Sequence, residues 1–174
     1  MTRWFALAGL VLSLGRAHGE IVDRIAVIID RTAIKQSDMV KEMRLLAFIN
    51  GEKPDLSLEE RKKTIGRLIE QTIIRKEIGM GHYPAPESAG VNQLFQQVRQ
   101  RYPSDAVFQQ ALASYGISQD QLMEHLRWQQ TVLQFVALRF GNGGASGDSN
   151  QSFFNWLDET RRQTRVLFKE EDLQ

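Results

Sequence analysis

Segments typical of β-strands lie near both ends of the chain, and the stretch between them has helical character. Residues 21–34 contain the run Ile25-Ala-Val-Ile-Ile29 and the turn signal Asp30-Arg31-Thr32, after which Ala33-Ile34 can start a return strand. The terminal segment 165–169 also has the composition of a strand. Because the backbone groups of a buried strand need partners, we expect the two segments to pair. The sequence therefore predicts a mainly α protein with a small β element, in which the N-terminal strand or hairpin pairs with the C-terminal strand.

Capping signals divide the middle of the chain into helices. Ser37 is expected to cap a first helix over 37–49. Ser57 followed by Glu60 forms a capping box, which predicts a second helix over 58–79. Further helices are expected over 87–102, 104–116, 118–140 and 153–163.

The longest of these helices, 118–140, is apolar on two sides. A helix with two apolar faces is either central in its domain or offers one face to a partner. The first stripe contains Leu122, Leu126, Leu133 and Val136, and the second contains Trp128, Val132 and Phe135.

A glycine-rich stretch, residues 140–154 (FGNGGASGDSNQSFF), interrupts the helical pattern. It lacks the third glycine of a dinucleotide loop and the Gly-Lys-Ser/Thr of a phosphate loop. No histidine follows Ser149 to complete a hydrolase triad. We therefore expect residues 141–149 to form a flexible tether, with Asp148 or Ser149 capping the next helix.

Residue types that usually carry chemistry are scarce. The chain has no cysteine, which excludes disulfides and thiolate chemistry. His82 and His125 have no companion ligands at metal-binding spacing. With 22 basic and 21 acidic residues, the chain lacks the basic excess of a nucleic-acid binder. We expect no catalytic residue, no metal, no cofactor and no nucleic-acid partner.

The N-terminus has the pattern of a secretory signal. Arg3 precedes the eleven-residue apolar run 4–14, and small residues precede a plausible cut between Gly19 and Glu20. The run is too short for a comfortable membrane span, although an uncleaved anchor is the alternative. The expected organisation is a signal peptide at 1–19, a helical domain at 20–140, the tether at 141–149, and a closing helix and strand at 150–174. Such a protein would be periplasmic, with no stable membrane span after cleavage.

Methionines and aromatic residues distributed over the helices suggest an adhesive surface. Methionine is flexible and polarisable, so it suits surfaces that accept varied apolar partners. Ordinary core packing is the alternative for any single one of these side chains. We expect a groove between the first helix and the long helix, with Met39, Met43, Phe95, Met123 and Trp128 as candidate ligand-binding residues.

Five short motifs, in order, resemble the N-terminal chaperone domain of the SurA family of periplasmic folding factors. They extend over nearly all of the chain that follows the signal. They are the opening strand from Ile21 to Asp30, Ile34-x-x-Ser37-Asp38, Leu68-Ile69-x-x-x-Ile73-Ile74, Phe108-x-x-x-Leu112-x-x-x-Gly116-Ile117-Ser118, and Trp156-Leu157-x-x-x-Arg161 followed by Val166-Leu167-Phe168.

The resemblance implies a function as well as a fold. In SurA-like proteins, parvulin prolyl-isomerase domains are inserted where this chain has only residues 141–149, so we expect no isomerase activity. What the resemblance implies instead is an ATP-independent chaperone that holds unfolded exported polypeptides, typically outer-membrane protein precursors. Two alternatives remain: an assembly module with one folded envelope partner, and an enzyme, either a residual isomerase or a hydrolase at Ser149.

Overall fold

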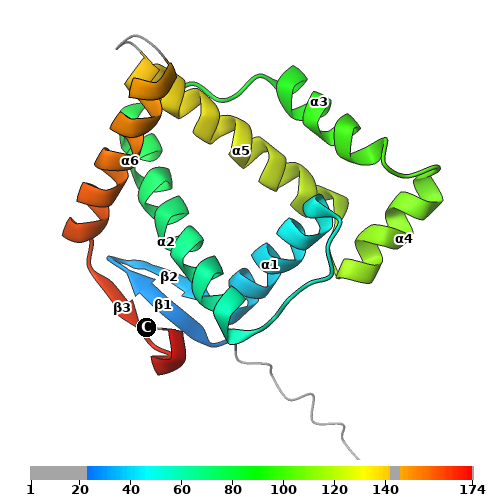
Figure 1. The fold of residues 1–174 in the computed structure, drawn as a ribbon, viewed down its shortest axis with the longest axis horizontal. Helices are drawn as coiled ribbons and strands as arrows, with labels where there is room; N and C mark the ends of the chain where they lie inside the picture. Colours follow the sequence, from blue (N-terminus) through cyan, green and yellow to red (C-terminus); the bar gives the residue numbers. More distant parts are fainter. Residues whose placement is uncertain (1–22, 142–145, 174) are drawn as a thin grey trace, which may run out of the picture.

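The computed structural model describes residues 23–141 and 146–173, with side chains from residue 149 onwards in the second range. The expected signal peptide and most of the expected tether lie outside these residues. Figure 1 shows the arrangement of the elements. In chain order they are β1 (Ile25–Ile29), β2 (Thr32–Lys35), α1 (Gln36–Asn50), α2 (Leu58–Gly81), α3 (Ser88–Arg99), α4 (Asp105–Tyr115), α5 (Gln119–Phe140), α6 (Ser146–Gln163), β3 (Val166–Phe168) and the 3-10 helix η2 (Glu171–Leu173).

The sheet joins the two ends of the described chain, as predicted. Its strand order is β2-β1-β3, and both pairings are antiparallel. Ile28 faces Leu167 across the β1–β3 pair. The backbone N–H of Asp30 donates to the carbonyl of Arg165 at 2.9 Å, which extends the pairing beyond the strand. The prediction of a mainly α protein closed by a small terminal sheet is confirmed.

The core has two parts. The first, which we call the sheet cluster, packs β1 and β2 against four helices. These are α2 and α6, together with the N-terminal half of α1 and the C-terminal half of α5. The second, the arm cluster, packs α3 and α4 against the other halves of α1 and α5. Figure 1 shows α3 and α4 on the side of α1 and α5 opposite to α2 and α6. The sheet cluster includes Val27, Met39, Met43, Ile69, Trp128, Phe135 and Leu157, and the arm cluster includes Phe48, Val98, Phe108, Leu112, Leu122 and Leu126.

Local capping chemistry fixes several helix ends as the sequence predicts. The Ser104 hydroxyl accepts a hydrogen bond from the backbone N–H of Val107, and Ser118 forms a full capping box with Gln121. Gly116 ends α4 in the left-handed conformation at φ 65°, which a residue with a side chain adopts at a cost.

The prediction that Ser37 caps the first helix is wrong. The helix begins at Gln36, and its capping residue is Lys35, two residues before Ser37. Its backbone N–H donates to the Asp38 carboxylate at 2.9 Å. The Ser37 hydroxyl instead donates to Asp23, which lies fourteen residues earlier in the chain. A contact from outside the helix has therefore taken the hydroxyl that local reasoning assigned to the cap.

The predicted tether at 141–149 overlaps the start of α6. Helix α6 begins at Ser146, so residues 146–149 belong to the helix, and neither Asp148 nor Ser149 is its cap. Residues 142–145 lie outside the described part of the chain. In the parts that the structure describes, no helix is both long enough and apolar enough to cross a bilayer.

Candidate functional site

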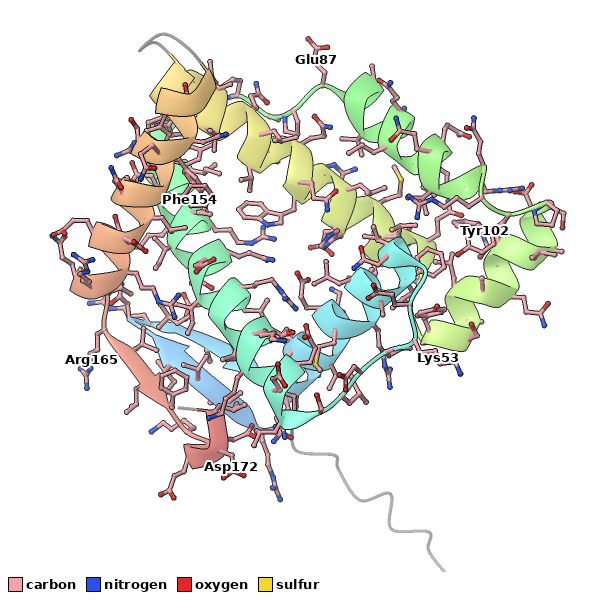
Figure 2. The ribbon with its side chains drawn as sticks, viewed as in Figure 1. Lys53, Glu87, Tyr102, Phe154, Arg165 and Asp172 are labelled. Carbon is pink, nitrogen blue, oxygen red and sulfur yellow. The ribbon has the colours of Figure 1, made fainter. Side chains whose placement is uncertain are left out.

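An apolar groove lies where the sheet cluster meets the arm cluster. Its volume is about 510 Å³, within the range of known ligand sites, and five helices contribute to it. Figure 2 shows the side chains of this region, with Phe154 labelled on the α6 side. The lining consists of Glu42 and Leu46 from α1, Arg67, Glu70, Gln71 and Ile74 from α2, Leu94 from α3, His125, Trp128, Gln129, Val132 and Leu133 from α5, and Phe153, Phe154 and Leu157 from α6.

Two large apolar side chains in the lining are strongly exposed. Leu133 of α5 is 63 % exposed and Phe154 of α6 is 57 % exposed. Isolated apolar residues on a surface are ordinary, but these two belong to one concave surface that also includes Val132 and Phe153. The groove therefore combines a buried apolar floor with apolar side chains that water can reach.

Trp128 lines the groove, and Arg75 of α2 packs against its ring. The side chain is 9 % exposed, and the Arg75 guanidinium carbon lies 3.8 Å from the ring centroid. This is a cation–π contact from α2 to α5. Burial lowers the pKa of Arg75 from its ordinary value, although the guanidinium stays charged at any physiological pH. The contact fixes the plane of the indole ring and so the shape of the groove beside it.

A buried polar group ties three helices together beside the apolar surface. Glu42 of α1 accepts a hydrogen bond from Gln71 Nε2 of α2 at 2.9 Å, and its other carboxylate oxygen lies 3.6 Å from His125 Nδ1 of α5. Burial alone would raise the pKa of Glu42, but the nearby His125 and the hydrogen bond from Gln71 outweigh it and lower the pKa below its ordinary value. Glu42 is thus a carboxylate at neutral pH, although it is only 8 % exposed.

Charged side chains at the groove are mostly paired. Arg67 donates from Nη2 to Glu60 at 2.9 Å and to the Thr64 hydroxyl at 2.7 Å. Glu70 accepts from Arg161 of α6 at 2.9 Å. One donor is left over, since Arg67 Nε is buried and has no acceptor among the described residues. Buried polar atoms without partners are uncommon in folded proteins, so this atom needs an explanation.

The residues predicted to bind a ligand do not lie together. Trp128 lines the groove, but Met39 and Met43 are only 1 % and 3 % exposed and belong to the sheet cluster. Phe95 and Met123 are half-buried against the arm cluster. The five candidate residues therefore do not line one common groove. Met39 and Met43 fill the core, and α2 and α6 supply side chains that the prediction did not include.

One sequence signal could have identified part of the groove. Phe153 and Phe154 are adjacent on a helix, and adjacent helical residues cannot both face the same core. Phe153 is accordingly buried and Phe154 exposed. Leu133 was visible as a member of an apolar stripe, but the stripe does not say which of its members stays uncovered.

A second cavity has a different character. It has a volume of about 680 Å³ and lies between the β1–β2 turn, α2 and the end of α6. Three of its charged side chains are paired: Lys76 donates to Asp30 at 2.7 Å, and Glu77 accepts from Arg139. The cavity is thus crossed by internal contacts, and the groove is the stronger candidate for binding.

Within residues 23–141 and 146–173, no three histidine or acidic side chains are grouped so that they could hold a metal ion. Comparison of the chain with protein-family models, with curated proteins and with solved structures gave no match.

Proposed function

We propose that this protein binds apolar segments of unfolded polypeptides in the groove and holds them reversibly, as an ATP-independent chaperone. The observation that carries the proposal is the exposure of Leu133 and Phe154 on a concave apolar surface. Large apolar side chains arranged in this way favour contact with another apolar chain.

The expected strength of binding suits a holding role. Covering the exposed parts of Leu133 and Phe154 would contribute about 1–2 kcal/mol each. Ordering the bound segment offsets much of the gain from the groove as a whole. We expect dissociation constants of about 1–100 μM, which allow release without a nucleotide.

The motif resemblance supports the same function. A SurA-type domain would have the same order of helices and a C-terminal strand that pairs with the first strand, as β3 pairs with β1 here. We accordingly propose that the clients are exported proteins such as outer-membrane precursors, which this protein would bind in the periplasm. The protein would act there without isomerase activity.

The first test measures aggregation of an unfolded outer-membrane β-barrel protein diluted from urea, with and without the protein at equal concentration. We expect the wild-type protein to suppress light scattering. The variants Leu133→Ser and Phe154→Ser should suppress it at least about threefold less, since each removes apolar area from the groove. Leu138→Ser is the matched control, because Leu138 is 47 % exposed on the same helix but does not line the groove.

Two results would contradict the proposal. One is an absence of suppression even at tenfold excess of the protein. The other is equal loss in Leu133→Ser and Leu138→Ser, which would separate the activity from the groove. A crosslinking experiment that captured one folded envelope protein, with no binding to unfolded chains, would favour the assembly-module alternative.

A further inference from the structure

On the polar side of the groove, two glutamine side chains have a hydrogen-bonding partner for the amide nitrogen but, within the described chain, not for the amide oxygen. Gln71 donates from Nε2 to Glu42, and the Gln129 side-chain nitrogen faces His125 Nε2 at 3.2 Å. Among the described residues, neither glutamine oxygen has a hydrogen-bond donor. Both side chains are half-buried and line the groove. Two amide oxygens without a donor thus belong to residues that line the groove. Arg67 lines it too, and its guanidinium has further N–H donors besides the buried Nε, which has no partner in the described part of the chain.

The charges around these groups are internally balanced. Glu70 pairs with Arg161 and Arg67 pairs with Glu60, each at 2.9 Å. Glu42 faces His125 and Gln71. A ligand that brought its own charge into the groove would need a partner that the site does not supply, so an uncharged ligand with both donors and acceptors fits best.

We propose that the polar side of the groove hydrogen-bonds the main chain of the bound segment, so that the occupant is an extended, uncharged polypeptide recognised largely without regard to sequence. This inference rests on the proposed function and adds the chemistry of recognition. Main-chain N–H groups would donate to the oxygens of Gln71 and Gln129. A main-chain carbonyl would accept from the Arg67 guanidinium.

The apolar part of the groove fits the same ligand. In an extended chain, successive side chains point to opposite sides. Side chains on one side would then contact Trp128, Leu133 and Phe154, while the main chain faces the glutamines. Each hydrogen bond between groups withdrawn from water adds modestly to affinity, and leaving such groups unpaired costs more. The arrangement would let many sequences bind, provided that they are apolar and unfolded.

The test compares two synthetic probes. The first is an eight-residue peptide of Leu, Val and Ser, blocked at both ends and labelled with a fluorophore. The second is its counterpart, in which alternate main-chain N–H groups are replaced by ester oxygens, so that donors are lost while the side chains stay the same. We expect the ester probe to bind about tenfold more weakly in fluorescence anisotropy.

A protein variant locates the effect. In Gln129→Leu, the amide probe should bind about fivefold more weakly, and the difference between the two probes should shrink accordingly. Gln134→Leu is the matched control, since Gln134 is on the same helix and does not line the groove. A loss of folding in a variant would be visible by circular dichroism, and the comparison of the two probes on the wild-type protein does not depend on any variant.

The outcomes separate this inference from the proposed function. Equal binding of both probes, with loss of both in Leu133→Ser, would overturn main-chain recognition and leave the chaperone proposal standing. If neither probe binds and the protein does not suppress aggregation, both proposals are overturned. Self-association in analytical ultracentrifugation that competes with the amide probe would also overturn the inference, because a second copy would then be the occupant.

Discussion

At the scale of single residues, Glu42 contacts side chains from two other helices beside the groove. One carboxylate reaches Gln71 on α2 and His125 on α5, so it holds three helices in a fixed relation around Trp128. A buried charge with partners is costly to strip of those partners, since the remaining groups are then left without compensation. Glu42 therefore supports the shape of the groove as well as the stability of the fold.

The first prediction concerns the variant Glu42→Gln and its dependence on pH. The folded-state pKa of Glu42 lies below the ordinary value of 4.5, so the unfolded chain binds more protons between those two values. The stabilisation by the carboxylate is thus fully present above pH 4.5 and is lost as the pH falls through the folded-state pKa. We expect the free energy of unfolding of Glu42→Gln to be about 1–3 kcal/mol lower than wild type at pH 7.

Urea unfolding at a series of pH values measures this difference. The wild-type and variant free energies should converge as the pH falls through the folded-state pKa of Glu42. Glu87→Gln is the control, because Glu87 is exposed and projects from the surface in Figure 2. A constant gap between wild type and Glu42→Gln at every pH would show that packing, and not the charge, is responsible.

The second prediction concerns Phe48, the centre of the aromatic group in the arm cluster. Its ring is 1 % exposed and lies 5.8 Å from Tyr102, 6.2 Å from Phe108 and 5.3 Å from Tyr115. Phe48→Ala should lower the free energy of unfolding by about 3–5 kcal/mol because it leaves a cavity. Phe48→Leu should cost clearly less. Thermal unfolding distinguishes these values, and equal costs would mean that the site collapses around either side chain.

At the scale of elements, α1 and α5 each cross from one core cluster to the other. Met39 and Met43 of α1 pack in the sheet cluster, whereas Phe48 packs in the arm cluster. On α5, Leu126 belongs to the arm cluster and Phe135 to the sheet cluster. The second predicted stripe (Trp128, Val132 and Phe135) packs in the sheet cluster. The first stripe divides: Leu122 and Leu126 pack in the arm cluster, Val136 packs against the sheet cluster, and Leu133 stays exposed. The groove lies where the helix passes between the clusters.

The third prediction concerns β3 and η2. Removing residues 164–174 would delete the partner of β1, the buried Leu173 and the ion pair between Arg61 and Glu170 at 2.6 Å. We expect the free energy of unfolding to fall by at least about 3 kcal/mol and the protein to aggregate through the uncovered edge of β1. Urea unfolding and light scattering check both effects.

A point substitution serves as its control. Leu167→Thr changes a 41 % exposed side chain on β3 and keeps a residue suited to strands, so its effect should stay within about 0.5 kcal/mol. Unchanged stability of the truncated chain would mean that the sheet does not depend on its third strand.

The parts of the fold that could be predicted are those set by neighbours in the chain. Ser104, Ser118 and Gly116 act within one helical turn, so their roles follow from local spacing. Ser37 could not be assigned in this way, because Asp23 from outside the helix takes its hydroxyl. The start of α6 within the Gly- and Ser-rich stretch also contradicts local preference, since those residues disfavour a helix interior.

The sequence predicts that an apolar groove exists but not which residues line it. Helical periodicity shows that α1 has an apolar stripe but not which element covers it, and α2 and the sheet cover Met39 and Met43. The combination of Gln71, Gln129 and Glu42 depends on three helices meeting, which no local pattern encodes. Trp128, one of the methionines and aromatic residues that the sequence offered as candidates, lines the groove.

At the scale of the whole molecule, the two clusters should behave as one folding unit. Because α1 and α5 are continuous through both, unfolding either cluster would leave apolar halves of these helices exposed. The fourth prediction is that hydrogen exchange in increasing denaturant gives the same midpoint for amides in α4 and in β1. Exchange of α4 at clearly lower denaturant, with β1 still protected, would show that the arm cluster unfolds separately.

The pairing of β1 with β3 has a consequence for how the protein is made. A ribosome finishes β1 first and all six described helices before it reaches β3, so the nascent chain carries a strand whose partner does not yet exist. Until synthesis is nearly complete, the sheet cannot close, and the helices that pack on it have no finished surface to meet.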